Sequence, residues 1–386
     1  MSDVPHLRFP EFSGEWEKCK LGDIATGFDY GMNAAAKPFD GENKYIRITD
    51  IDEASSTYID KDIVSPDGTL TENYLVNDRD ILLARTGAST GKSYLYRKSD
   101  GKLYYAGFLI RANVTKHNPY FVFSQLHTHR YWSWVSIMSA RSGQPGINSQ
   151  EYSSFPVYVT SLREEEKISA LLSLIDERIA TQNKIIEDLK LLKSAITDRL
   201  YSEVRGTAYT YRQLFDVINE RNKDNIYHNV LSASQELGMI DRSDINIDIK
   251  FEQASIVSYK IVRKGDYVVH LRSFQGGFAF SEKTGICSPA YTILRPKDNL
   301  MYGYLSHYFT SKQFVKSLNL VTYGIRDGRS INVDEWLDMK VVIPEKQKQL
   351  HILTTINSIE FKLRNEQKIY TRLIKQKSYL LRQMFI

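Results

Sequence analysis

The sequence has few cysteines, no long apolar run and no strong excess of charge of one sign. Its 386 residues include two cysteines, Cys19 and Cys287, too few for a disulfide framework or a multi-cysteine zinc site. No apolar run approaches the ~20 residues that span a bilayer. The first residues, Met-Ser-Asp-Val-Pro-His, contain neither a basic leader nor an apolar signal core. We therefore expect a cytoplasmic protein with reduced thiols and no membrane span.

The small net charge of +5 is unevenly distributed along the chain. It is −2 in residues 1–160, −1 in 161–205, +2 in 206–343 and +6 in 344–386. Hydrophobic residues make up 42% and charged residues 25% of the chain, which is typical of a folded globular protein. If the larger regions bind nucleic acid, they must do so through local basic patches, because their bulk charge gives little attraction for phosphates.

An internal repeat with an offset of 184 residues is the strongest pattern in the sequence. Two segments that begin Gly146-Ile-Asn and Ser330-Ile-Asn share their apolar and aromatic positions. The aligned pairs are Ile147 with Ile331, Asn148 with Asn332, Tyr152 with Trp336, and Val157 with Val341. The offset then continues without a gap to the end of the chain, which indicates a duplication.

A helical stretch with heptad spacing follows each of these segments. The predicted seam residues are Ile168, Leu172, Ile175, Ile179, Ile186, Leu189, Ile196 and Leu200 in the first copy, and Ile352, Ile356, Ile359, Leu363, Tyr370, Leu373, Leu380 and Met384 in the second. Polar residues interrupt both seams at the same two positions: Gln182 and Lys193 in the first, Glu366 and Lys377 in the second. A sustained 3.5-residue period predicts two long helices that pair as an antiparallel coiled coil. Packing of each helix on its own domain is the alternative.

Weaker matches extend the repeat upstream. Asp80–Gly87 resembles Asp266–Gly276, and Leu21-Gly-Asp23-Ile24 resembles Leu214-Phe-Asp216-Val217. Short alternating stretches between turn residues predict β-rich domains with a few small helices. The predicted fold class is therefore α+β, with two β-rich domains and two long helices. The predicted boundaries are 1–160 for the first domain, 161–205 for the central helix, 206–343 for the second domain and 344–386 for the C-terminal helix.

Patterns typical of enzymes are incomplete here. The segment Thr86–Ser93 looks like a phosphate-binding loop, but three residues rather than four separate Gly87 from Gly91. Glu165-Glu166-Lys167 is the nearest match to the acidic-x-Lys pattern of metal-dependent nucleases, and the helix dipole explains acidic residues at that place. No spacing of His, Cys or acidic residues suggests a metal site, and no cofactor loop is visible. We predict no catalytic residue, metal or cofactor in this chain.

Two matched pairs of loops offer side chains that suit DNA. Gly-rich turns can present backbone N–H groups and hydroxyls to phosphate oxygens, and Arg and Gln can make bidentate contacts with guanine and adenine edges. The candidate residues are Arg85, Thr86, Ser89, Thr90, Lys92, Arg141 and Gln144 in the first half, and Arg272, Ser273, Gln275, Arg326 and Arg329 in the second. The loops at Tyr30–Lys37 and Leu231–Gly238 are weaker candidates. Ordinary solvated turn chemistry is the alternative for each residue.

This layout resembles the specificity subunit of type I restriction–modification systems. The opening Pro5–Trp16 followed by Lys20-Leu-Gly-Asp-Ile24 is similar to the way many of those subunits begin. The order of domain, long helix, domain and long helix also matches over essentially the whole chain. The family's usual proline and Glu-Gln at the start of the helix occur in the second copy as Pro344-Glu-Lys-Gln347, whereas the first copy, Ser161–Glu166, lacks the proline.

The resemblance implies that each globular domain is a target-recognition domain for one half of a split, asymmetric DNA sequence. The paired helices would set the gap between the two halves. Two modification subunits that use S-adenosylmethionine would bind around the helices, and separate restriction subunits would use ATP and Mg. This chain would be non-catalytic. Because the two domains share little sequence between landmarks, we expect different half-sites. The alternatives are a coiled-coil adaptor that binds protein or peptide partners, and a self-sufficient enzyme.

Overall fold

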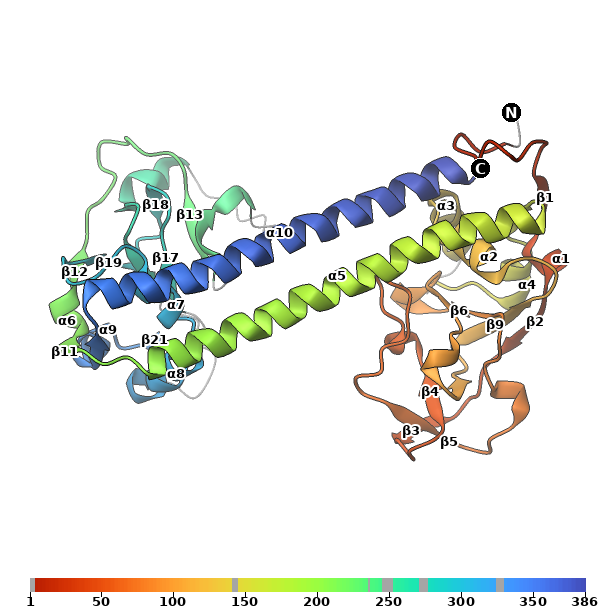
Figure 1. Cartoon of the computed structure of the whole chain (residues 1–386), viewed down its shortest axis with the longest axis horizontal. Coiled ribbons are helices and arrows are strands. Elements are labelled where there is room, and N and C mark those ends of the chain that lie inside the picture. Colours follow the sequence, from red (N-terminus) through yellow and green to blue (C-terminus); the bar gives the residue numbers. More distant parts are fainter. Residues whose placement is uncertain (1–3, 141–144, 235–236, 245–252, 271–276, 324–329) are drawn as a thin grey trace. The chain divides into compact units, whose positions relative to one another are not determined.

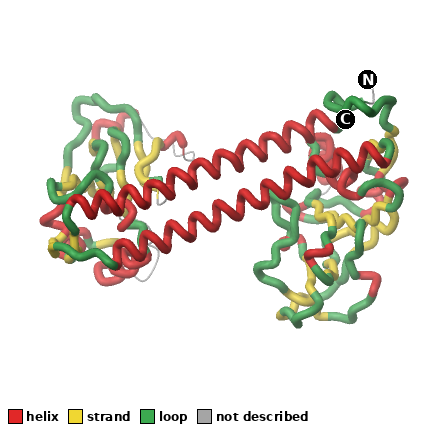
Figure 2. Tube along the Cα trace, in the orientation of Figure 1, coloured by secondary structure: helices red, strands yellow, loops and turns green. Residues whose placement is uncertain are grey.

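The computed structural model divides the chain into two compact units. Unit 1 comprises Met1–Lys184 with Gln367–Ile386, and unit 2 comprises Ile185–Glu366. The structure describes residues 4–140, 145–234, 237–244, 253–270, 277–323 and 330–386. Both units combine strands, small helices and part of each long helix (Figures 1 and 2).

A four-stranded antiparallel sheet of order β2-β9-β6-β7 forms the centre of unit 1. Its strands are β2 (Ala25–Tyr30), β9 (Leu109–Val114), β6 (Asp80–Ala84) and β7 (Ser93–Leu95). Strand β6 is buried along its whole length because it has a core on each face. Ile81 and Leu83 pack on the helical side, whereas Leu82 and Ala84 pack toward β4 and β8.

Small helices and strand pairs surround this sheet. The helices are α1 (Leu21–Ile24), α2 (Pro119–Gln125), α3 (His129–Ser139) and α4 (Ser149–Ser153). The strand pairs are β1 (Glu17–Lys20) with β10 (Pro156–Val159), β3 (Ala35–Pro38) with β5 (Val64–Asp67), and β4 (Lys44–Ile46) with β8 (Leu103–Tyr105). The side chain of Asn118 caps α2, which has Pro119 in its first turn, and Thr128 caps α3.

Unit 2 repeats the central sheet in the order β12-β19-β16-β17. Its strands are β12 (Phe215–Ile218), β19 (Thr292–Pro296), β16 (Tyr267–Val269) and β17 (Phe278–Phe280). The other strand pairs are β11 (Thr207–Thr210) with β22 (Lys340–Ile343), β13 (Leu231–Ser234) with β14 (Gly238–Asp241), β15 (Lys260–Val262) with β18 (Gly285–Cys287), and β20 (Thr322–Tyr323) with β21 (Ser330–Ile331). The small helices are α6 (Tyr211–Leu214), α7 (Tyr304–Tyr308), α8 (Lys312–Ser317) and α9 (Val333–Asp338).

The long helices are α5 (Leu162–Ser202) and α10 (Lys346–Met384), so their starts differ by the repeat offset. In unit 1, Lys377 Nζ of α10 lies 2.7 Å from an Asp176 oxygen of α5. In unit 2, Lys193 Nζ of α5 lies 2.5 Å from a Glu360 oxygen of α10. These pairs join the same two repeat positions in opposite directions, as antiparallel pairing requires (Figure 1). The predicted fold class is confirmed.

The seam positions agree with this pairing. All sixteen predicted seam residues are buried or half-buried. The two lysines that interrupt the seams are the lysines of the interhelical ion pairs, with 28% and 19% of the Lys193 and Lys377 side chains exposed. The other two interruptions, Gln182 and Glu366, are buried. At 1.5 Å per residue, the 41 residues of α5 span about 60 Å.

The landmarks of the repeat are structural residues. Asn148 and Asn332 accept backbone N–H hydrogen bonds as the N-caps of α4 and α9. Tyr152 and Trp336, which follow in these helices, are fully buried. The upstream alignment of Leu21 with Leu214 is wrong by three residues. Helix α1 begins at Leu21, but its counterpart α6 ends at Leu214, because the two capping boxes begin at Lys20 and Thr210.

Both cysteines are free thiols, and burial raises the pKa of Cys19 to about 11 and that of Cys287 to about 12. In the described parts of the chain, no helix has the length and apolar character of a membrane span.

Candidate nucleic-acid interface

The Gly-rich turn of unit 1 lies between β6 and β7 and is held by two distant segments. The Arg85 N–H donates to the Phe108 carbonyl, and the Ile147 N–H donates to the Arg85 carbonyl. Thr86 pairs with Gly146 in an isolated antiparallel bridge. The turn at 85–92, the loop at 106–108 and the segment at 145–148 therefore form one surface of the unit.

The backbone of this turn is used inside the turn itself. The N–H groups of Thr90 and Lys92 donate to Gly87 and Ser89, and that of Gly91 donates to Ala84. The Gly87 N–H donates to the Pro145 carbonyl. These bonds engage the N–H groups of Gly87, Thr90, Gly91 and Lys92, so these four are not free to bind phosphates, and the rest of the expectation for this turn stays a prediction. The physical reason is that a tight turn with two glycines at positive φ closes its own hydrogen bonds.

Thr90 is a structural residue of the turn. Its side chain is buried, and its hydroxyl donates to the Gly87 carbonyl over 2.8 Å. The phenol of buried Tyr152 also holds this turn in place, because it accepts from the Gly91 N–H and donates to the Ala84 carbonyl. A direct contact from the Thr90 hydroxyl to DNA is therefore not supported.

Arg85 has the geometry of a preorganised recognition side chain. Its guanidinium lies over the ring of Tyr30, with its carbon 4.6 Å from the ring centroid. Its Nε is buried without a hydrogen-bond partner, and Nη1 is 3.5 Å from the Gly107 carbonyl. The Tyr30 phenol accepts from the Ser149 N–H, and this hydrogen bonding lowers the pKa of Tyr30. An arginine held on an aromatic face retains donors for a base edge or a phosphate.

A small cavity of about 270 Å³ lies beside Arg85. Thr86, Met138, Ile147, Asn148 and Glu151 complete most of its lining. Glu151 is committed to the capping box of α4, in which it accepts from the Asn148 N–H. The cavity places a guanidinium next to a side-chain amide, which is a combination suited to hydrogen-bonding groups of a nucleotide.

The other candidates of this turn lie at its edge. Ser89 and Lys92 are half-buried, and the Lys92 ammonium is 3.9 Å from the carboxylate of exposed Glu53. Phe108, which sequence reasoning missed, has a side chain that is 61% exposed. An isolated exposed phenylalanine after Ala-Gly carries no recognisable sequence signal, whereas its contact with the backbone of Arg85 places it at this surface.

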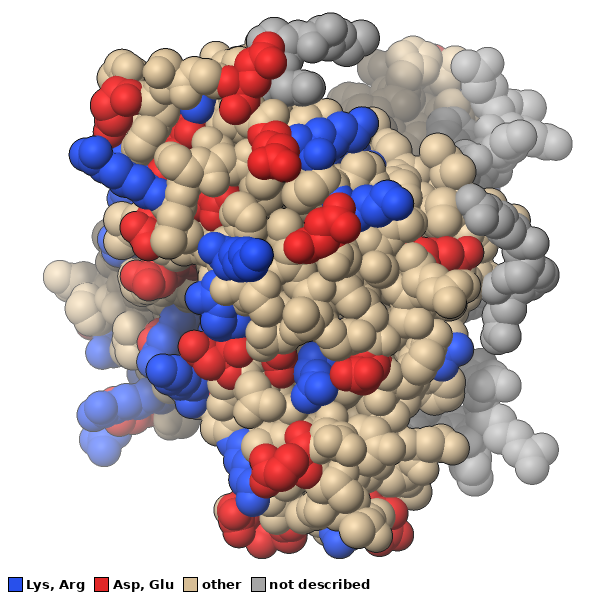
Figure 3. Space-filling model, turned by 90° about the vertical axis from the view of Figure 1, so that its right-hand side faces the viewer, with Lys and Arg blue, Asp and Glu red and all other residues tan. Residues whose placement is uncertain are grey.

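Charge is mixed on the face of unit 1 that Figure 3 displays. Figure 3 shows Lys and Arg residues interspersed with Asp and Glu residues on the displayed face, without a large region of one sign among the residues it describes. Residues 1–160, which form the globular part of the unit, carry a net charge of −2.

The remaining candidates cannot be placed. Arg141, Gln144, Arg272, Ser273, Gln275, Arg326 and Arg329 lie outside the described residues. The hairpin β13–β14 covers most of the weaker candidate loop at 231–238.

Glu165, the acid of the nuclease-like sequence, is a structural residue at the start of α5. Its fully buried carboxylate accepts from the N–H groups of Asn118 and Thr160 and lies 2.8 Å from His117 Nδ1. Its neighbour Glu166 is exposed. In the described part of the chain, no three His, Cys or acidic side chains form a metal-binding group.

The fold defines a protein with two related units, each built around a four-stranded antiparallel sheet, and known proteins share this fold. Residues 13–191 match the family described as the type I restriction modification DNA specificity domain. The chain is 24% identical over 198 residues to the type I restriction enzyme MjaVIII specificity subunit of Methanocaldococcus jannaschii. That alignment covers 51% of this chain and 44% of the relative, so less than half of the relative's length is matched.

Two solved structures share the fold. The type I restriction–modification system S subunit from M. genitalium aligns with a TM-score of 0.60 and 13% identity, over 99% of each chain. A chain from a study of complex assembly and conformational transition of the type I R-M system aligns with a TM-score of 0.56 and 14% identity, over 96% of this chain and 97% of that one. The matched model places residues 13–191 in the family of the type I restriction modification DNA specificity domain, and the two solved structures show the fold of the chain.

Proposed function

We propose that this chain is the non-catalytic DNA specificity subunit of a type I restriction–modification complex and that it works in the cytoplasm. Each unit reads one half of a split, asymmetric DNA target. The observation that carries the proposal is the duplicated framework: two sheets of the same strand order, in a chain whose first half matches a DNA specificity domain. A recognition unit that was duplicated and then diverged in its loops suits a DNA target with two different half-sites.

The partners follow from the family. We propose that two modification subunits, which bind S-adenosylmethionine and methylate adenine, assemble around α5 and α10. Restriction subunits that use ATP and Mg then complete the nuclease. The face of unit 1 in Figure 3 has no extended basic region among its described residues, which supports a contribution of these partners to phosphate neutralisation. The chain alone should bind DNA weakly, with a small dependence on salt.

Methylation mapping tests the proposal. The chain is co-expressed with the modification subunit encoded beside it in a methylation-free host, and N6-methyladenine is located by sequencing. We expect one split, asymmetric motif that is methylated only when this chain is present. A palindromic motif would contradict the proposal that the two units recognise different half-sites. No motif, with the modification subunit intact and bound, would favour the adaptor alternative.

Arg85 gives a test within unit 1. Arg85→Ala should relax or abolish recognition of one half-site and leave the other unchanged, since a good bidentate base contact contributes roughly 1–3 kcal/mol of discrimination. Arg97→Ala, which removes an exposed arginine of the same unit, is the matched control. Arg141 with Gln144, and Arg326 with Arg329, remain proposals of the same kind for the two half-sites. If recognition of both half-sites were lost equally, Arg85 would contribute to general DNA affinity or to stability instead of to one half-site.

The paired helices are proposed to set the spacer between the half-sites. Insertions of equal length in α5, between Asp176 and Lys193, and in α10, between Glu360 and Lys377, would leave both interhelical ion pairs able to form. The mapped motif should then keep its half-sites and change its spacer. An insertion in α5 alone is the control, because it puts the two ion pairs out of register. An unchanged spacer in the variant with both insertions would refute the proposal that the helices set the spacer length.

A further inference from the structure

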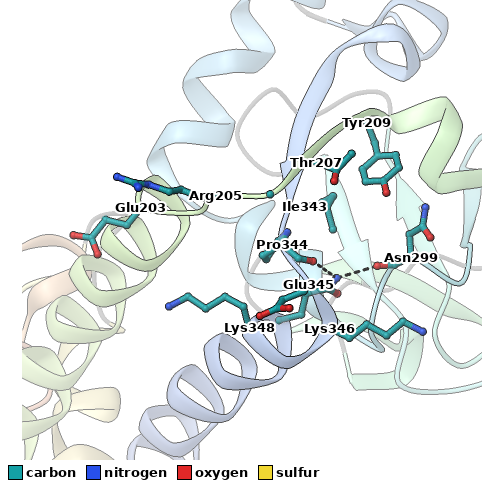
Figure 4. A pocket seen from close by; sticks show the side chains of 12 residues that line it. Glu203, Arg205, Thr207, Tyr209, Asn299, Ile343, Pro344, Glu345, Lys346 and Lys348 are labelled. Atoms are coloured by element: carbon teal, nitrogen blue, oxygen red, sulfur yellow. Dashed lines mark hydrogen bonds between the residues drawn. The ribbon is translucent and has the colours of Figure 1, made fainter.

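Unit 2 has a cavity of about 790 Å³ beside the start of α10. Figure 4 shows Glu203 and Arg205 in the link that follows α5, and Lys346 and Lys348 in the first turn of α10. Thr207 and Tyr209 of β11 form another wall. The volume is within the ~300–1,000 Å³ of typical ligand pockets.

At the equivalent place in unit 1 lie Arg8 and Trp16, the two ends of residues 8–16, here called the arm. The repeat offset makes Lys348 equivalent to Glu164, and Gly206 and Trp16 both directly precede the strand that pairs with the last strand of the unit. Trp16 is 2% exposed, and its Nε1 donates to Glu164. Arg8 donates to both oxygens of the same carboxylate over 2.7 and 2.8 Å.

The charge at the matching position is reversed between the units. Glu164 of unit 1 is buried and neutralised by the arm's arginine, whereas Lys348 of unit 2 is exposed. Within the described chain, Lys348 and Arg205 form no ion pair. The lining also contains the acids Glu203 and Glu345 and the apolar residues Ile343 and Pro344. Arg205, Lys346 and Lys348 outnumber these acids, and Glu203 is already paired with Arg199, so an occupant with a carboxylate next to an apolar side chain suits the lining.

We propose that this cavity binds an acidic, extended segment of a partner polypeptide, in the manner in which the arm occupies unit 1. The partner is the modification subunit, so the inference rests on the proposed function. A polypeptide fits better than DNA because the equivalent site already holds one, through a charged side chain and a buried ring. The cavity gives the complex an attachment that the filled site of unit 1 does not offer.

The test measures binding of the purified modification subunit to the full-length chain without DNA. Lys348→Glu should raise the Kd at least ~10-fold, because it turns an attractive charge pair into a repulsive one. Lys340→Glu is the matched control: Lys340 is an exposed lysine of unit 2 outside the cavity lining, and its substitution should change the Kd less than about twofold. Both variants should melt at the wild-type temperature. An unchanged Kd for Lys348→Glu, or equal weakening by both substitutions, overturns the inference.

Photo-crosslinking identifies the occupant. A photoreactive residue at exposed Thr207, within the assembled complex, should capture an acidic segment of the modification subunit, and Lys348→Glu should remove that product. Capture of DNA, or of no polypeptide, overturns the inference. Methylation by the wild-type complex is scored in parallel. If methylation is sequence-specific but the crosslink and the change in Kd are absent, only the docking site is refuted. If an intact, bound complex methylates no motif, the proposed function is refuted.

Discussion

The two units share a framework but connect their long helices to it with different chemistry. At the start of α5, the Glu165 carboxylate accepts from the Thr160 N–H. The equivalent residues in unit 2 are Gln349 and Pro344. Proline has no N–H, and the Gln349 amide donates to the Pro344 carbonyl instead, over 2.9 Å. The backbone donor of Thr160 is thus replaced by the carbonyl acceptor of Pro344. The acid Glu165 is replaced in step by the amide Gln349.

The same residues join the helix to the neighbouring loop in both units. Glu165 accepts from the Asn118 N–H, whereas Gln349 accepts from the Met301 N–H and donates to the Asn299 carbonyl. The comparison teaches that duplication preserved the positions of the contacts rather than their chemical identity. A buried polar group is tolerated when its full set of partners changes with it.

The largest effect is expected where unit 2 replaces a tyrosine by a tryptophan. Trp336 is fully buried and stacks on Tyr211 with a centroid distance of 4.1 Å, whereas its counterpart Tyr152 uses its hydroxyl for two hydrogen bonds. Trp336→Ala should lower the free energy of unfolding of unit 2 by about 3–5 kcal/mol, measured by denaturant unfolding. Trp336→Phe should cost much less, since Nε1 has no hydrogen-bond partner. Similar losses for both variants would contradict a packing role.

Gln349→Glu tests the matched exchange of partners. A carboxylate here would face the carbonyls of Pro344 and Asn299, and we expect a loss of about 3 kcal/mol in the unfolding free energy at neutral pH. Adding Pro344→Thr should recover part of it, because a backbone N–H becomes available as in unit 1. Glu165→Gln is the reciprocal variant, with an expected loss of about 1–2 kcal/mol. Full stability of Gln349→Glu would refute this account.

A histidine should make unit 1 sensitive to acid. Burial, and then the charge of Lys377, lowers the pKa of His127 to about 4. Since the unfolded histidine has a pKa near 6.5, the unfolded state binds more protons between pH 6.5 and 4, and stability falls as pH falls through this window. The loss should be on the order of 2 kcal/mol. His127→Gln should flatten this part of the pH profile, and an unchanged profile would assign the loss to other groups.

The smallest effect is expected for the interhelical ion pairs. Asp176→Lys or Lys377→Asp should each destabilise unit 1 by about 1 kcal/mol, and the double variant should regain most of the loss. Asp176 also accepts from the Tyr120 hydroxyl, so recovery should be more complete for the Lys193–Glu360 pair of unit 2. A double-mutant cycle by thermal unfolding measures both couplings. Zero coupling in both pairs would leave the apolar seam alone to set the register.

The long helices could be predicted from sequence because a heptad period is a local signal repeated over many residues. The loops could not, because their partners are distant in sequence. The N–H groups that Gly87 and Gly91 were expected to present are bound by Pro145 and Tyr152. The misalignment of Leu21 with Leu214 has a similar cause: a short match of apolar residues outweighed the capping boxes that fix where each small helix begins.

The stacking of Arg85 on Tyr30 has a consequence for the thermodynamics of recognition. A free arginine side chain loses about 2 kcal/mol of conformational entropy when a complex immobilises it. Here the ring of Tyr30 already confines the guanidinium in the unbound protein, so most of that loss occurs during folding. Binding through Arg85 would then begin from an ordered side chain, and its selectivity would depend on the hydrogen bonds that a given base can complete.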